Sequence, residues 1–172
     1  MATLRMEPSV YRELLEHAQS CLPQEACGLI AGRICPCPAP AQGKEGEQAS
    51  CQGTFAHLDQ ALAAGDCLKV VEKVYPLTNI DASPEHFSLD PAEQFAAIKD
   101  MRARGLVALG NFHSHPSTPA RPSAEDLRLA HDPTASYLIL SLATEQPILR
   151  AFHIEQGQAT PEPIEIETPV SL

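Results

Sequence analysis

The sequence lacks any cluster of lysine and arginine residues. Acidic residues outnumber basic ones by 22 to 12, which gives a formal net charge of -10 at pH 7. Proteins that bind a nucleic-acid backbone or an anionic membrane surface present clustered basic side chains to the phosphates. The composition therefore argues against nucleic acid and membrane as partners, and its negative charge mainly predicts solubility.

Long apolar stretches are also absent. Charged residues interrupt the first 20 residues at Arg5, Glu7, Arg12, Glu13 and Glu16, so this segment lacks the apolar region of a signal peptide. No other segment approaches the roughly 18 apolar residues of a membrane-spanning helix. We therefore expect a cytoplasmic protein.

Neither the length nor the cysteine content fits a small disulfide-stapled protein. The chain has 172 residues, of which 44% are hydrophobic and 20% are charged, as is typical of a soluble globular domain. Its 6 cysteines are an even number, but the chain is too long and too rich in core residues for the small secreted class. We expect one domain over residues 1–172 with mostly free thiols.

One segment, residues 35–53, has almost no large apolar side chain. It combines three prolines with three glycines, so it cannot bury enough surface to order itself, and we interpret it as a loop insertion. An alternative places function there, because Cys35, Cys37, Cys51 and His57 could form a second zinc site or a redox dithiol. Their spacing fits no familiar zinc finger.

The rest of the chain alternates helical and strand patterns without an internal repeat. Residues 9–20 form an amphipathic helical pattern. A second helix begins at Asp90, an N-cap residue followed by Pro91 at the first helical position and by Glu93 three residues after the cap, and it ends at Gly105. Its residues Phe95, Ile98 and Met101 fall on one face, and a short third helix is expected over Ser123–Ala130.

The expected strands complete a mixed α/β order. Apolar and β-branched runs predict strands at Glu25–Arg33, Cys67–Thr78, Leu106–Phe112, Tyr137–Ala143, Pro147–Ile154 and Pro163–Ile166. Pro76 should place its end of the second strand at an edge of the sheet, because proline has no N–H to donate. The run at 106–112 is nearly continuous in apolar residues and reads as a central strand.

Two histidines at the end of this central strand can face one metal ion. Side chains alternate along a strand, so His113 and His115 project from the same side while Ser114 faces the other way. Pro116 ends the strand, and the chain then turns into a helix whose first turn contains Asp126. Two imidazoles and one carboxylate leave a fourth tetrahedral position open, which is the arrangement of catalytic zinc sites.

Each of these residues also has an ordinary interpretation. A His-x-His pair at the end of a strand is often a hydrogen-bonded surface pair. Ser123 and Asp126 have the spacing of a helix capping box. Glu25, taken alone, is a solvated acid at the start of a strand.

Taken together, the residues form one specific pattern. Glu25 is followed by His-Ser-His-Pro at 113–116, by seven residues between His115 and Ser123, and by Ser-x-x-Asp at 123–126. This pattern resembles the JAMM motif of the MPN-domain metallopeptidases, of the short bacterial type, and departs from it at no position. The resemblance extends to residues 25–32 and 79–94 and covers about residues 5–155.

The resemblance implies a fold and an activity. The fold would be an α/β MPN (JAMM) domain, a mixed β-sheet or half-barrel flanked by helices and similar to cytidine deaminases. His113, His115 and Asp126 would be ligands of one catalytic zinc ion. Glu25 would act as general base on the metal-bound water and then protonate the leaving amine, while Ser123 would donate a hydrogen bond to the oxyanion.

The same resemblance suggests the class of substrate. Members of the family often cut peptide or isopeptide bonds after the C-terminal Gly-Gly of ubiquitin-like proteins, and short bacterial members act on sulfur-carrier proteins of that fold. We therefore expect a ubiquitin-like or sulfur-carrier protein as the partner. The alternative is a non-catalytic MPN module that serves as a scaffold, although such modules typically lack the ligand residues.

Overall fold

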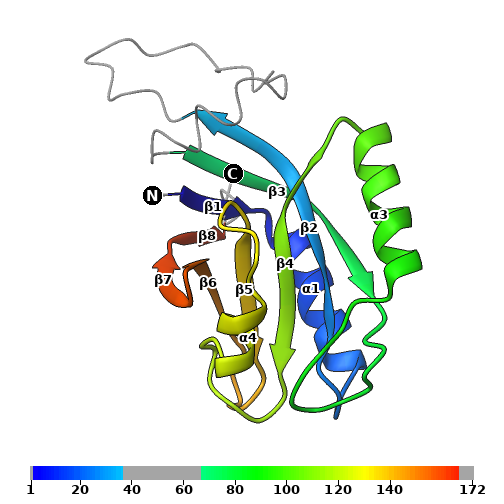
Figure 1. The fold of residues 1–172 in the computed structure, drawn as a ribbon, viewed down its shortest axis with the longest axis vertical. Coiled ribbons are helices and arrows are strands. Elements are labelled where there is room, and N and C mark those ends of the chain that lie inside the picture. Colours follow the sequence, from blue (N-terminus) through cyan, green and yellow to red (C-terminus); the bar gives the residue numbers. More distant parts are fainter. Residues whose placement is uncertain (1, 37–66, 167–172) are drawn as a thin grey trace, which may run out of the picture.

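The computed structural model describes residues 2–36 and 67–166, and Figure 1 shows a mixed β-sheet with helices packed against it. The strands are β1 (Ala2–Met6), β2 (Cys27–Pro36), β3 (Cys67–Leu77), β4 (Val107–His115), β5 (Ser136–Ser141), β6 (Ile148–Glu155), β7 (Gln158–Glu162) and β8 (Ile164–Ile166). In the described ranges, the helices are α1 (Pro8–Ser20), α3 (Pro91–Ala103) and α4 (Ala124–Leu129). The predicted loop insertion at 35–53 lies almost wholly outside these ranges.

The strands form a single sheet in the order β7-β6-β5-β4-β2-β3-β1-β8. β4 runs parallel to β5, and β1 runs parallel to both β3 and β8, while the remaining neighbours are antiparallel. The sheet curls far enough for β7 to contact β1. This curled mixed sheet with flanking helices is the α/β half-barrel that the family resemblance implied.

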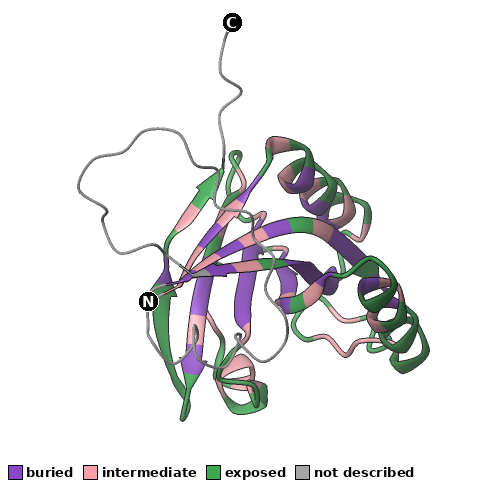
Figure 2. Cartoon of the chain, turned by 90° about the horizontal axis from the view of Figure 1, so that it is seen from above, coloured by how far each residue is buried: buried purple, intermediate pink, exposed green. Residues whose placement is uncertain are grey.

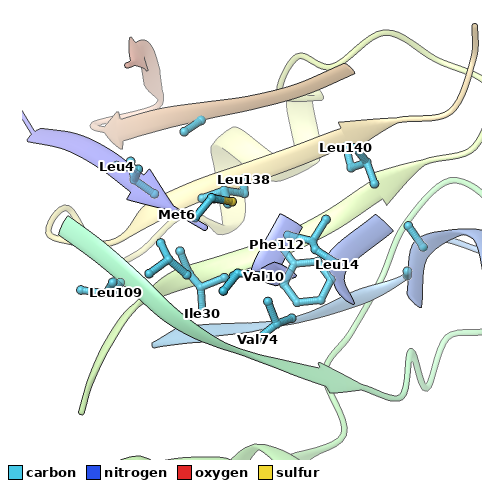
Figure 3. Close-up of a cluster of buried hydrophobic side chains, with 14 residues drawn as sticks. Leu4, Met6, Val10, Leu14, Ile30, Val74, Leu109, Phe112, Leu138 and Leu140 are labelled. Atoms are coloured by element: carbon cyan, nitrogen blue, oxygen red, sulfur yellow. The ribbon is translucent and has the colours of Figure 1, made fainter. Parts of the chain in front are cut away.

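The main core lies on one face of the sheet, against α1. Figure 3 shows Val10 and Leu14 of α1 directed at Ile30 and Phe112 of the sheet, and these side chains are almost completely buried. Burying one such side chain stabilises the fold by about 1.5–3 kcal/mol. Because the side chain of Phe112 of β4 packs on this face, the side chain of its neighbour His113 must point to the opposite face.

The opposite face is covered by the other two helices. Ala97 and Met101 of α3 pack against Leu29 of β2, while Tyr137 and Ile139 of β5 form a separate cluster near α4. Figure 2 shows the central strands buried and the outer surfaces of the helices exposed. The face that carries His113 is therefore the one between α3 and α4.

Most predicted elements are confirmed to within a few residues, including the central position of β4. Pro76 also lies where expected, because β1 pairs only with the first part of β3, from Cys67 to Val71. Within the described residues, the last part of β3 therefore has β2 as its only strand neighbour. The prediction missed β1 and β7, which close the ends of the sheet.

The predicted start of α3 is confirmed, with Asp90 as the N-cap followed by Pro91, but one detail predicted for this helix is wrong. Phe95 does not share a buried face with Met101, because it is 67% exposed, with the ammonium group of Lys99 5.7 Å from the centre of its ring. Glu93 lies three residues after the N-cap, as predicted. Its carboxylate accepts hydrogen bonds from the backbone N–H (2.6 Å) and the hydroxyl (2.9 Å) of Thr78, so it fastens α3 to the end of β3.

The cysteines in the described ranges are not all free thiols. The prediction of mostly free thiols is confirmed for Cys21 and Cys27 but is wrong for Cys35, which is disulfide-bonded. The proposed second site at Cys37, Cys51 and His57 lies outside the described residues. None of the helices in the described ranges is long and apolar enough to cross a membrane.

Candidate metal centre and active site

β4 holds the two histidines side by side in the middle of the sheet. His113 pairs with Cys27 of β2 and with Ile139 of β5, and only 3% of His113 and 5% of His115 is exposed. Their Nε2 atoms lie 3.0 Å apart. The predicted alternation is confirmed, since Ser114 between them points to the other face, where its hydroxyl accepts from the backbone N–H of Ala26, just before β2.

The first turn of α4 brings a carboxylate to the same point. Ser123 is the N-cap of α4, and its Oγ accepts a hydrogen bond from the backbone N–H of Asp126 (3.1 Å). In return, Oδ2 of Asp126 accepts from the backbone N–H of Ser123 (2.7 Å). Oδ1 of Asp126 lies 3.4 Å from Nε2 of His113, and Oδ2 lies 3.8 Å from Nε2 of His115. The carboxylate of Asp126 can therefore cap α4 and face the two histidines at the same time.

Glu25 enters the site from the loop before β2. Its backbone N–H donates to the carbonyl of Ser83 (2.9 Å), and its carbonyl accepts from the Nδ2 group of Asn79 (3.1 Å). The residue is 4% exposed, and its Oε1 lies 4.0 Å from Nε2 of His115. The sequence-predicted site residues are thus brought together from three separate segments.

The protonation of the two acids differs. Burial, followed by the negative charges of Asp126, Glu125 and Glu85, raises the pKa of Glu25 to about 8. Burial also acts to raise the pKa of Asp126, but the hydrogen bond and charge of His113 and the hydrogen bonds from Ser123 outweigh it and bring the pKa to about 2. Asp126 is therefore ionised at neutral pH. A cation nearby would favour the ionised form of Glu25 as well.

The donor set fits a divalent cation. Nδ1 of His115 donates to the carbonyl of Pro119 (2.9 Å), which leaves the Nε2 lone pair of the same ring directed into the site. The pKa of His115 is lowered, chiefly by burial, so the ring stays neutral as a ligand must be. One ligand atom from each of His113, His115 and Asp126 lies within 4.8 Å of the others. Two imidazoles and one carboxylate are ligands that zinc accepts.

A pocket extends from these residues toward α4. Its walls include Asn111 of β4, Tyr137 and Ile139 of β5, and Leu129 of α4, and it is bordered by His113 and by the acids Glu85 and Glu125. Its apolar wall and acidic border lie directly beside the candidate metal ligands. The pocket therefore has room for a small chemical group next to them.

Sequence reasoning missed several residues that support the site. The ring of Phe87 stacks on His113, with centroids 4.6 Å apart and planes inclined by 24°. Asn79 joins Glu25 to this same loop, because its Nδ2 group also donates to the carbonyl of His86 (3.1 Å). These contacts join residues of different strands and loops, and no local pattern marks them in the sequence.

Several known proteins are similar to this chain in sequence and in fold. Residues 7–155 match the family described as prokaryotic homologs of the JAB domain. The CysO-cysteine peptidase of Mycobacterium tuberculosis is 30% identical over 156 residues, which cover 89% of this chain and 84% of that protein.

Two solved structures are also similar. The solution structure of a protein from Desulfitobacterium hafniense has a TM-score of 0.72 and 43% identity, over 96% of this chain and 93% of that one. A JAB1/MPN domain protein from Archaeoglobus fulgidus, with a TM-score of 0.51 and 18% identity over 94% of this chain and 97% of that one, shows the shared fold. The chain belongs to the prokaryotic homologs of the JAB domain, and it is a hydrolytic enzyme of the JAMM type.

Proposed function

We propose that this protein is a zinc-dependent metallopeptidase that hydrolyses a peptide or isopeptide bond at the C-terminus of a ubiquitin-like or sulfur-carrier protein. The observation that carries the proposal is the convergence of His113, His115 and Asp126 within 4.8 Å, with the Glu25 carboxyl group 4.0 Å from His115. Catalytic zinc sites combine three protein ligands with one open position. In this protein, the carboxyl group of Glu25, which can accept and release a proton, lies beside the three proposed ligands.

The three ligands would hold one zinc ion through Nε2 of His113, Nε2 of His115 and a carboxylate oxygen of Asp126. When bound, zinc supplies a Lewis acid that polarises the scissile carbonyl and makes water a stronger acid. Asp126 brings the negative charge that a cation needs in a buried place, and the cap from Ser123 keeps its carboxylate in position.

Glu25 would act as the general base and then as the general acid. Its Oε atoms take a proton from the attacking water and return it to the departing amine. Burial and neighbouring acids raise its pKa to about 8 in the absence of a cation, whereas a cation lowers it again. These opposing influences suit a group that must both accept and release a proton near neutral pH.

Ser123 would stabilise the oxyanion. Its Oγ already accepts a hydrogen bond from the backbone N–H of Asp126, so the hydroxyl proton is left to donate. It borders the pocket beside His113, where the carbonyl oxygen of a bound substrate would lie. A donor placed where negative charge develops contributes to the rate of acyl transfer.

The substrate class follows from the relative in Mycobacterium tuberculosis, whose name states that it acts on CysO-cysteine. By analogy, we infer that this enzyme removes cysteine or a short extension from the C-terminal Gly-Gly of a carrier protein. A scaffold without catalytic activity would have no need of a complete ligand set together with Glu25, and no contact in the described residues favours that alternative.

The test uses the zinc-loaded full chain and a carrier protein that bears extra residues beyond Gly-Gly. We expect mass spectrometry to show release of the extension, loss of cleavage when a chelator removes zinc, and recovery when zinc is returned. A matched carrier with Ala-Ala in place of Gly-Gly controls for general peptidase activity. A zinc-loaded enzyme that leaves the Gly-Gly carrier uncut would contradict the proposed substrate.

A further inference from the structure

Two buried polar atoms near the metal centre lack a hydrogen-bond partner among the described residues. One is Nδ1 of His113 and the other is Oδ1 of Asn111, and neither is accessible to solvent. A buried polar group without a partner costs about 1–3 kcal/mol. Two such atoms beside a functional site therefore call for a physical explanation.

The two atoms belong to side chains on the same face of β4. Asn111 and His113 are two positions apart on β4, so their side chains project from the same face of the sheet, with Cα atoms about 7 Å apart. Both side chains border the same pocket, and the ring of Phe87 covers His113. An amide oxygen and a ring nitrogen at this spacing can meet after a small rotation of either side chain.

The contacts of the histidine pair occupy three of its four ring nitrogens. A carbonyl oxygen only accepts, so Nδ1 of His115 must carry a proton to donate to Pro119 (2.9 Å). Nε2 of a neutral His115 is then an acceptor. Nε2 of His113 lies 3.0 Å from that atom and 3.4 Å from Oδ1 of Asp126, whereas Nδ1 of His113 has no partner among the described residues.

Binding of a cation through Nε2 of His113 would fix the tautomer of this ring. A ligand atom must offer a lone pair, so the one proton of the neutral ring then lies on Nδ1. This new donor is buried and needs an acceptor. His115 already has one in Pro119, whereas the acceptor without a partner on the side of His113 is Oδ1 of Asn111.

We propose that Asn111 is a positioning residue for His113: its Oδ1 accepts the proton on Nδ1 of His113 when Nε2 binds the metal ion. The inference rests on the metal site proposed above. Hydrogen bonds of this kind to a ligand's second nitrogen fix its tautomer and the orientation of its ring, and their loss costs 10- to 100-fold in metal affinity in known sites. Asn111 would thus set how tightly the protein holds zinc without touching the ion.

The main test measures the zinc affinity of the full chain by competition with a chromophoric chelator. Asn111→Leu has a similar size but no acceptor, and we expect it to bind zinc at least tenfold more weakly. Asn111→Asp keeps an oxygen in place and should retain the affinity of the wild type. Tyr137→Phe is the matched control, because this residue borders the same pocket but its hydroxyl bonds to Asp132 rather than to the site.

The pattern across the variants separates positioning from a general role in stability. If Asn111→Leu and Asn111→Asp bind zinc equally well, the proposal is wrong. If both are weakened by the same factor while Tyr137→Phe is not, the site depends on the asparagine for packing and the proposal is also wrong. Rescue by aspartate alone supports it.

A second measurement requires no variant and so does not depend on folding of Asn111→Leu. Nitrogen-15 spectra of the zinc-loaded wild type should show His113 protonated at Nδ1, with that proton exchanging slowly and close to the Asn111 side chain. A proton on Nδ1 that exchanges freely with water would overturn the proposal. Zinc affinity is measured apart from cleavage, so a wild type that fails to bind zinc would refute the proposed function instead.

Discussion

Ser114 and Ala26 are joined by two hydrogen bonds that fasten the Glu25 segment to the strand of the proposed metal ligands. The hydroxyl of Ser114 accepts from the backbone N–H of Ala26 at 2.8 Å, and the backbone N–H of Ser114 donates to the carbonyl of Ala26 at 2.9 Å. Ser114 lies between His113 and His115 but points to the opposite face. The Ser114 side chain, which points away from the proposed metal site, therefore positions Ala26, the residue next to the proposed base Glu25.

Replacing Ser114 by alanine should lower the rate of hydrolysis without removing zinc. The substitution leaves the buried N–H of Ala26 without its acceptor, which costs about 1–3 kcal/mol of stability and frees the adjacent Glu25 to move. We expect a lower kcat, a lower Tm and an unchanged zinc content. Ser114→Thr keeps the hydroxyl and serves as the control. An unchanged kcat in Ser114→Ala would show that this pair of hydrogen bonds does not position Glu25.

Replacing Glu25 by glutamine should separate catalysis from metal binding. The amide has the size of the carboxyl group but cannot take a proton from water, and general-base catalysis contributes about 10²- to 10⁴-fold in rate. Because the three ligands remain, we expect zinc content equal to that of the wild type and kcat reduced by at least a hundredfold. Elemental analysis and a cleavage assay on one preparation measure both quantities. Full activity of this variant would refute the role assigned to Glu25.

The metal-free protein should become less stable as the pH rises through the neutral range. The pKa of Glu25 is about 8 in the folded state, above the ordinary value of 4.5, because burial disfavours its charge and nearby acids repel it. A carboxyl group whose folded pKa is raised binds its proton more tightly in the folded state. Its contribution to stability is therefore full below about pH 4.5 and is lost as the pH rises toward 8.

Chemical denaturation of the metal-free protein at several pH values measures this loss. Glu25→Gln has no carboxyl group at this position, so its stability should change less between pH 5 and 8 than that of the wild type. Two parallel curves would mean that Glu25 has an ordinary pKa in the folded protein.

The sequence predicted the core of the site because its signals are local. Strand alternation places His113 and His115 on one face, and Ser123 with Asp126 is a capping pattern that the structure confirms. Their convergence with Glu25 needed the family resemblance, since Glu25 and His115 are far apart in the chain. The supporting contacts of Phe87 and Asn79 depend on the path of a loop, which no periodicity describes.

The closure of the sheet could not be predicted for a similar reason. β1 is short, and it pairs with β3 and β8, whose residues lie far along the chain. Such pairings depend on the whole topology and leave only a weak alternation in the sequence. The exposure of Phe95 has the same origin, because the helical pattern contains several possible faces and the packing of Ala97 and Met101 against the sheet selects one.

Replacing Gly28 by alanine should destabilise the sheet beside the site. A Cβ atom at this position would lie 2.2 Å from the carbonyl oxygen of Tyr75 and 2.5 Å from the ring of Phe112, so strand and core would have to shift. Overpacking of this kind costs about 1–3 kcal/mol or more. Gly105→Ala is the comparison, because a Cβ there meets nothing within 4 Å, although the positive φ of 68° still adds strain. We expect the larger loss of Tm for Gly28→Ala, and equal losses would contradict this reading of the contact.

Substitutions of Asp126 should show whether the carboxylate serves the metal, the helix or both. Asp126→Asn keeps an oxygen that can accept from the backbone N–H of Ser123, so α4 retains its cap, but the negative charge is lost. Asp126→Ala removes both the charge and the acceptor. We expect both variants to bind zinc at least tenfold more weakly than the wild type, since each leaves the two histidines without an anionic ligand.

In the metal-free state, Asp126→Asn should keep helix α4, whereas Asp126→Ala should lose it. Hydrogen exchange of the backbone N–H of Ala130, which bonds to the carbonyl of residue 126 (3.0 Å), measures this difference. If Asp126→Asn binds zinc as tightly as the wild type, the carboxylate is a cap alone and the metal site must be completed by another residue.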